Sequence, residues 1–94
     1  MAIARNVVGP KVRERRCQLK LTQPMLAARC RRLGWDLSRE TLAKIECQFR
    51  WVSDFELLCL ALALNASVSD LLPSTELAPP LLKKTFCELA REAP

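Results

Sequence analysis

The stretch that decides the fold runs from residue 22 to residue 46 and reads TQPMLAARCRRLGWDLSRETLAKIE. It contains two short helical patterns in close succession. Thr22 and Ser38 are good N-cap residues for the first and the second pattern, and Gly34 is a residue type that commonly follows the last turn of a helix. We therefore predict two short helices with a joint at Gly34.

Two charged residues fall where a core residue belongs. On the second of these helices, Glu46 shares the inner face with Leu42 and Ile45. Arg16 lies on the flank of the apolar face of an earlier helix, predicted over residues 9–20. Burying either charge alone would be costly. We therefore expect Arg16 and Glu46 to form an ion pair that ties the two helices together.

The rest of the chain also favours helices. Leucine and alanine dominate its 94 residues, and two glycines are too few for a hairpin-rich protein. Ser53 with Glu56 reads as a capping box for the helix DFELLCLALAL, and Asn65 suits a left-handed helix terminus. A short helix is expected at about residues 68–72. The sequence thus predicts an all-α fold in one domain.

The positive charge is concentrated at the amino-terminal end. Up to Gly34 there are nine basic residues against one acidic residue, a net charge of +8, whereas the remainder carries −3. The basic residues are Arg5, Lys11, Arg13, Arg15, Arg16, Lys20, Arg29, Arg31 and Arg32. Such a segment can simply be a solvated face, but a polyanionic partner, most often nucleic acid, is the alternative that we favour.

Several functional classes are not expected. The chain has no histidine, and its five cysteines include no CxxC pair, so neither a zinc site nor a Cys/His catalytic pair is predicted. There is no carboxylate pair in a plausible cleft and no phosphate-binding loop. We therefore expect a protein that is not an enzyme and has no cofactor and no metal. The absence of a signal peptide and of a long apolar run predicts a cytoplasmic protein.

The order of several residues resembles the Cro/C1-type (XRE-like) helix-turn-helix family. The resemblance covers about residues 7–72, and the residues that carry it are Arg16, Thr22, Gln23, Leu26, Ala27, Ser38, Leu42, Ile45, Glu46, Leu57, Leu60, Ala61, Leu64 and Ser67. It implies a compact, lambda repressor-like domain of five helices over residues 7–72, after an arm of residues 1–6. Residues 73–94 would then form a linker and an amphipathic C-terminal helix.

In that family the second helix crosses the DNA backbone and the third lies in the major groove. Matching positions imply contact with double-stranded DNA by Gln23, Ser38, Arg39, Glu40, Thr41 and Lys44. Arg50 is a further candidate because it lies in the loop after the third helix. Gln23 and Arg50 would contact phosphate, whereas Arg39, Glu40 and Lys44 would contact bases. Glu40 could instead pair with Lys44 on a solvated helix.

Two departures affect the third helix. The joint before it is longer than in minimal members, because RLGWD is inserted, and Trp35 is a candidate to fill the resulting gap. Gln48 stands where the family usually has glycine, so either a non-glycine residue adopts a positive φ there or the turn differs.

A second apolar stripe on the fourth predicted helix has no partner within the family fold. It consists of Phe55, Leu58, Cys59 and Leu62, and the C-terminal helix carries another stripe with Leu82, Phe86 and Leu89. The C-terminal helix could fold back on its own chain, form a dimer arm, or do both, and we favour a homodimer. The resemblance implies a transcription regulator, a repressor in our interpretation. The alternative is an antitoxin-like or adaptor module with little DNA binding.

Overall fold

The computed structural model describes residues 4–74 and contains five helices in that range. They are α1 (Gly9–Gln18), α2 (Gln23–Arg32), α3 (Arg39–Glu46), α4 (Asp54–Ala63) and α5 (Val68–Leu71). The described part of the chain has no strand, and the predicted all-α fold is confirmed. The predicted C-terminal helix, with Leu82, Phe86 and Leu89, lies outside the described residues.

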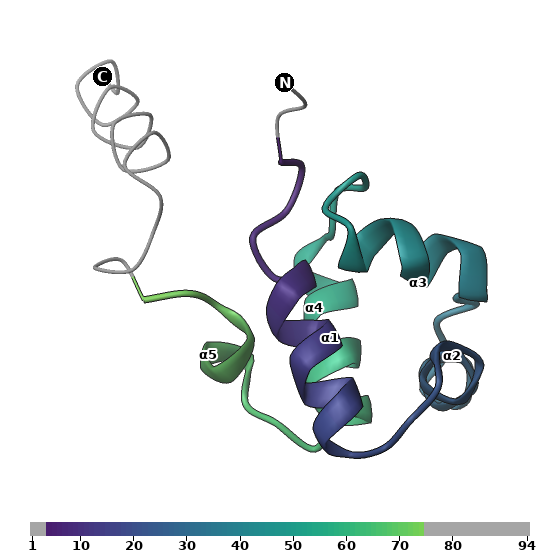
Figure 1. The fold of residues 1–94 in the computed structure, drawn as a ribbon. Coiled ribbons are helices and arrows are strands. Elements are labelled where there is room, and N and C mark those ends of the chain that lie inside the picture. Colours follow the sequence, from purple (N-terminus) through teal and green to yellow (C-terminus); the bar gives the residue numbers. More distant parts are fainter. Residues whose placement is uncertain (1–3, 75–94) are drawn as a thin grey trace.

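The five helices form a closed ring around one core (Figure 1). Helix α1 contacts α3 and α5, α2 contacts α3 and α4, and α4 also contacts α5. The core contains leucines from four of these helices and from the loops between them, and Leu26, Leu37, Leu42, Leu60 and Leu64 are fully buried within it. Fully burying one leucine is worth about 1.5–3 kcal/mol, so this cluster is what holds the ring together.

Local sequence signals set the helix ends. Thr22 and Ser38 accept hydrogen bonds from Met25 N and Thr41 N, at 3.2 and 3.1 Å, as expected of N-caps. Ser53 forms the predicted capping box with Glu56. The first helix is shorter than predicted and ends at Gln18, because the chain turns at Lys20 with φ of 59°.

The longer joint between α2 and α3 is packed against the core. Gly34 turns the chain with φ of 99°, and Trp35 N–H donates to Cys30 O at 3.1 Å. Trp35 is half-buried against the core, while Leu37 is fully buried. Arg31 Nη1 donates to Leu37 O at 2.8 Å. Both tryptophan and leucine therefore fill the space that the inserted residues create.

Helices α1 and α3 approach closely at one end. A Cβ atom on Gly9 would overlap Ile45 O and would lie 2.9 Å from Glu46 O, so only glycine fits there. The close approach places the amino-terminal end of α1 against the carboxyl-terminal end of α3. Gly9 thus has a packing role that its helix-starting position alone does not reveal.

Candidate nucleic-acid interface

Helix α3 presents an exposed polar face. Arg39, Glu40 and Lys44 are exposed, and Thr41 is half-buried. No ion pair joins Glu40 to Lys44 in the part of the chain that the structure describes, so the solvated-pair alternative finds no support there. Ser38 and Thr41 are hydrogen-bonded to each other at 2.9 Å, in addition to the cap. The face thus offers a cation at each end of the helix and a carboxylate between them.

The opposite face of α3 is anchored by Glu46. Arg16 Nε donates to Glu46 Oε2 at 2.7 Å, and Arg16 Nη2 donates to Oε1 at 3.0 Å. Only 8% of the Glu46 surface is exposed. Arg16 Nη1 also donates to Leu21 O at 2.8 Å. The hydrogen bonds to Glu46 raise the pKa of Arg16 above its ordinary value, and the expected pair ties α1 to α3.

Gln23 joins this network. Its amide Nε2 donates to Glu46 Oε1 at 3.2 Å, from the first residue of α2. Gln23 was expected to donate to phosphate, and here one of its two amide hydrogens is used within the protein. The second hydrogen and the amide oxygen remain available, since an amide carries two donors and one acceptor. Glu46 therefore orients α1, α3 and the side chain at the start of α2 together.

The guanidinium group of Arg50 makes several hydrogen bonds within the protein that the sequence did not suggest. Its Nη1 and Nη2 donate to Glu56 Oε1 and Oε2, both at 3.0 Å, and Nη1 also donates to Trp51 O at 3.1 Å. These bonds from Arg50 hold the pKa of the Glu56 carboxyl below its ordinary value. The charge of Arg50 is thus compensated within the protein, and its predicted phosphate contact stays a prediction.

Much of the amino-terminal basic charge serves the fold. Arg15 donates to Leu64 O and Asn65 O at 3.1 and 3.2 Å, and Arg29 donates to Ala63 O at 3.0 Å. These are carbonyls at the carboxyl-terminal end of α4, where a helix lacks intrahelical donors. The sequence did contain a signal for these contacts, because the last turn of α4 has no basic residue of its own to bind its carbonyl groups.

The turn after α3 settles the question raised by Gln48. Gln48 adopts φ of 66°, so a non-glycine residue does occupy the left-handed position. Gln48 N–H donates to Ile45 O at 3.0 Å, and Phe49 N–H donates to Lys44 O at 2.8 Å. The backbone thus makes the usual helix-terminating hydrogen bonds, and α3 ends as it would with glycine.

The outer face of α4 is apolar and exposed, but one residue predicted to belong to it is buried. Phe55, Leu58 and Leu62 are 57%, 49% and 59% exposed. Cys59, which was assigned to the same stripe, is only 4% exposed and therefore cannot belong to an exposed docking surface. It faces the core because α4 packs against α2 and α5 on two sides, which leaves a narrower outer face than the helical periodicity suggested.

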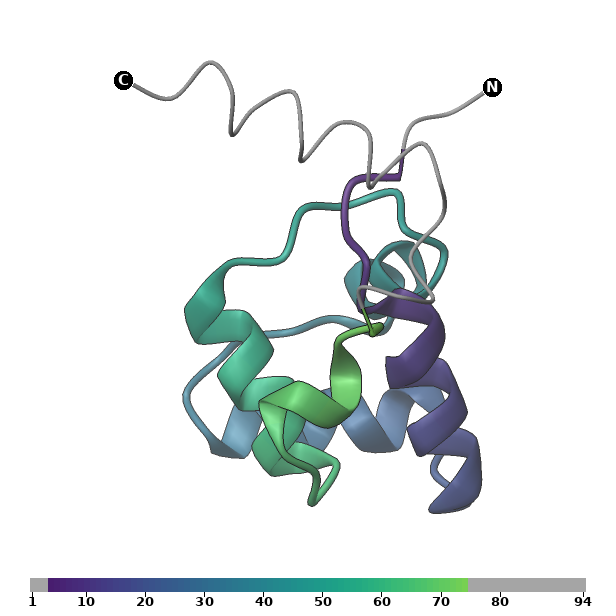
Figure 2. The same cartoon turned by 90° about the vertical axis from the view of Figure 1, so that its left-hand side faces the viewer.

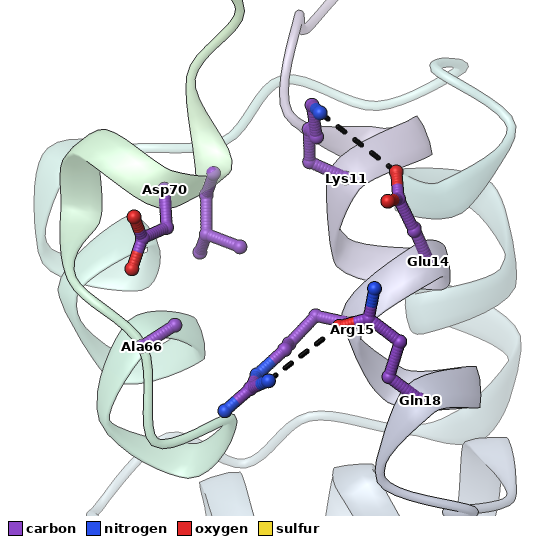
Figure 3. A pocket seen from close by; sticks show the side chains of 7 residues that line it. Lys11, Glu14, Arg15, Gln18, Ala66 and Asp70 are labelled. Carbon is purple, nitrogen blue, oxygen red and sulfur yellow. Dashed lines mark hydrogen bonds and ion pairs between the residues drawn. The ribbon is translucent and has the colours of Figure 1, made fainter.

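A pocket between α1 and α5 is an unrelated feature (Figure 3). It has a volume of about 230 Å³ and is lined by Lys11, Glu14, Arg15, Gln18, Ala66, Asp70 and Leu71. Lys11 pairs with Glu14 at 3.8 Å, and Arg15 Nη1 donates to Gln18 Oε1 at 3.5 Å. Figure 1 places α5 and α3 on opposite sides of α1, so this pocket is remote from the exposed face of α3.

No helix among residues 4–74 is long and apolar enough to span a membrane.

Helices α2 and α3, packed together with α3 exposed on its polar side, define a helix-turn-helix protein. Comparison with protein-family models and with curated protein sequences gave no match. Solved structures did match. The restriction-modification controller protein C.AhdI from Aeromonas hydrophila is 31% identical, with a TM-score of 0.61, over 68% of this chain and 89% of that chain. The clp gene regulator ClgR from C. glutamicum is 28% identical, with a TM-score of 0.64, over 76% and 86%. The chain belongs to the Cro/C1-type (XRE-like) helix-turn-helix family.

Proposed function

We propose that this protein is a transcription regulator that binds double-stranded DNA in a sequence-specific manner, with α3 in the major groove. The observation that carries the proposal is the two-sided character of α3. Its inner side is fixed by the buried Glu46 and its hydrogen bonds to Arg16 and Gln23. Its outer side leaves Arg39 and Lys44 exposed. A rigid helix with unengaged polar side chains is what base recognition requires.

The similar solved structures support this class of function, since their descriptions name a restriction-modification controller and a gene regulator. We further propose that the protein acts as a repressor. Occupying an operator can exclude other proteins from the same DNA, and this needs no activity beyond DNA binding.

The test is binding to duplexes selected from a random library. Arg39→Ala and Lys44→Ala are each expected to weaken binding to the selected site by about 1–3 kcal/mol without loss of helical circular dichroism. Lys11→Ala is the matched control, because Lys11 is exposed and lies on the side of α1 that lines the α5 pocket. If no duplex is selected, or if the two α3 variants bind as the wild type does, the reading role of α3 is wrong. The adaptor alternative would then gain support.

We also propose that the protein binds DNA as a homodimer through the exposed stripe of α4, which consists of Phe55, Leu58 and Leu62. Each of these large apolar side chains is about half exposed in the single chain. An uncovered apolar stripe on a helix is typical of an interface. Helix α4 packs on α2 and α5, so a partner at its outer face leaves the polar side of α3 free. Two copies would then read two half-sites about one helical turn of DNA apart.

Sedimentation equilibrium tests the dimer. Leu58→Lys should convert a full-length dimer to monomer, whereas Leu33→Lys should not, because Leu33 is a similarly exposed leucine at the C-cap of α2 rather than on α4. A wild-type chain that remains monomeric at tens of micromolar ends the dimer proposal. It would leave the DNA-binding proposal standing, because a monomer can still be tested for selective binding.

A further inference from the structure

One side chain fastens the amino-terminal segment to the end of α3. Asn6 Nδ2 donates to Ile45 O at 3.1 Å and to Arg50 O at 2.8 Å. Its other amide atom, Oδ1, accepts from Gly9 N–H at 2.8 Å. Asn6 therefore joins the start of α1 to residues on both sides of the turn that follows α3.

Backbone contacts extend this attachment by one residue. Arg5 N–H donates to Gln48 O at 2.9 Å, and Gln48 Nε2 donates to Asn6 O at 3.0 Å. Gln48 is the residue that holds the left-handed turn. Figures 1 and 2 both show the amino-terminal segment running beside the loop that connects α3 to α4. The backbone at Arg5 is thus held beside the carboxyl-terminal end of α3.

The charges near this turn differ in how they are used. Arg50 is neutralised by Glu56 through two hydrogen bonds of 3.0 Å. Arg5 is exposed, and within residues 4–74 its guanidinium group has no hydrogen-bond or ion-pair partner. Lys44 lies in the last turn of α3, on the exposed face. Of the three cations near this turn, Arg50 is compensated within the protein, whereas Arg5 and Lys44 are available.

We propose that Arg5 contacts a phosphate of the DNA that α3 reads, and that Asn6 is the positioning residue that holds it there. The inference rests on the proposed DNA-binding function. The major groove is about 12 Å wide, so a helix inserted into it lies between two phosphate backbones. An arginine whose backbone is held beside the end of that helix has one of these backbones within reach of its side chain. Arg5 brings to this phosphate a guanidinium group that no carboxylate compensates, unlike that of Arg50.

The test is the salt dependence of DNA affinity, measured by fluorescence anisotropy on the full chain. Each phosphate contact on duplex DNA contributes about 0.9 to the slope of log affinity against log salt. Arg5→Ala is expected to lower the magnitude of the slope by about 0.9, equally for a selected site and for an unrelated duplex, with an unchanged melting temperature. Arg5→Lys should restore the slope. Lys11→Ala removes the same charge from the far side of α1 and should leave the slope at the wild-type value.

Asn6→Ala tests the positioning role. It should lower the slope as Arg5→Ala does, and in the Arg5→Ala background it should lower the slope no further. An Arg5→Ala slope equal to that of the wild type overturns the proposal, and so does an Asn6→Ala slope equal to it. Failure of the wild type to bind any duplex would instead refute the DNA-binding function itself. The two failures are therefore distinguishable.

Discussion

Removing Arg16 should destabilise the fold more than any exposed charge change. Glu46 accepts three hydrogen bonds, of 2.7 and 3.0 Å from Arg16 and 3.2 Å from Gln23. Its side chain is 3% exposed. Arg16→Met keeps most of the side-chain length but deletes two of these bonds and leaves a buried carboxylate with one neutral donor. Hydrogen bonds to charged groups contribute about 1.5–3 kcal/mol each, and breaking one partner of a buried ion pair costs about 3–5 kcal/mol.

The Arg16 side chain is 13% exposed, so water reaches part of the site. We therefore take the lower end of the range for breaking a buried ion pair, about 3 kcal/mol of unfolding free energy. For a domain of this size, 1 kcal/mol shifts the melting temperature by about 4–8 °C. Arg16→Met should therefore melt roughly 12–24 °C below the wild type. Glu46→Ala should cost a similar amount. The double variant should cost less than the sum, because it leaves no unpaired charge.

Thermal and urea unfolding followed by circular dichroism provide the assay. The control is Lys11→Met, which breaks the exposed Lys11–Glu14 pair of 3.8 Å and should cost less than about 1 kcal/mol. If Arg16→Met is as mild as Lys11→Met, or if the double variant is strictly additive, Glu46 does not depend on Arg16 and the reasoning fails.

Three further predictions concern other parts of the fold. Arg50 lowers the pKa of Glu56 in the folded protein, so the pair stabilises the fold above the ordinary carboxyl pKa of about 4.5, and this stabilisation is lost as the pH falls through the pKa of Glu56 in the folded protein. Glu56→Gln should therefore lower the melting temperature at pH 7 but have little effect at about pH 2, and an equal difference at both pH values would contradict this. Burial raises the pKa of the Cys30 thiol to about 11, so peptide mapping after alkylation at pH 8 should show fast labelling of the exposed Cys17 and Cys47 and protection of Cys30 and Cys59; rapid labelling of Cys30 in native protein would refute its burial. Gly9→Ala should lower the free energy of unfolding by about 1–3 kcal/mol, because its Cβ would overlap Ile45 O, whereas Ala28→Gly in α2 should lower it by about 1 kcal/mol. A wild-type melting temperature for Gly9→Ala would show that α1 and α3 can separate freely.

The sequence by itself determined the features that depend on neighbours in the chain. Thr22, Ser38 and Ser53 each cap a helix because an N-cap hydrogen bond closes over two or three residues. The periodicity that put Glu46 beside Leu42 and Ile45 is equally local, and a misplaced charge on each of two helices was enough to suggest that Arg16 and Glu46 pair. The family resemblance rests on the same local patterns.

Only the tertiary structure decided how the remaining charges and surfaces are used. Arg15 reaches Leu64 O, and Asn6 reaches Ile45 O, across 49 and 39 positions of sequence. Such bonds depend on how the helices pack against one another. A count of basic residues treats Arg15 as free positive charge and cannot show that its side chain is bound within the fold. Cys59 turned out to be buried for the same reason, because the packing of α4 between α2 and α5 sets the width of its exposed face. Helical periodicity gives the direction in which a side chain points, but whether that direction meets water, a carbonyl or another helix is a property of the packed fold.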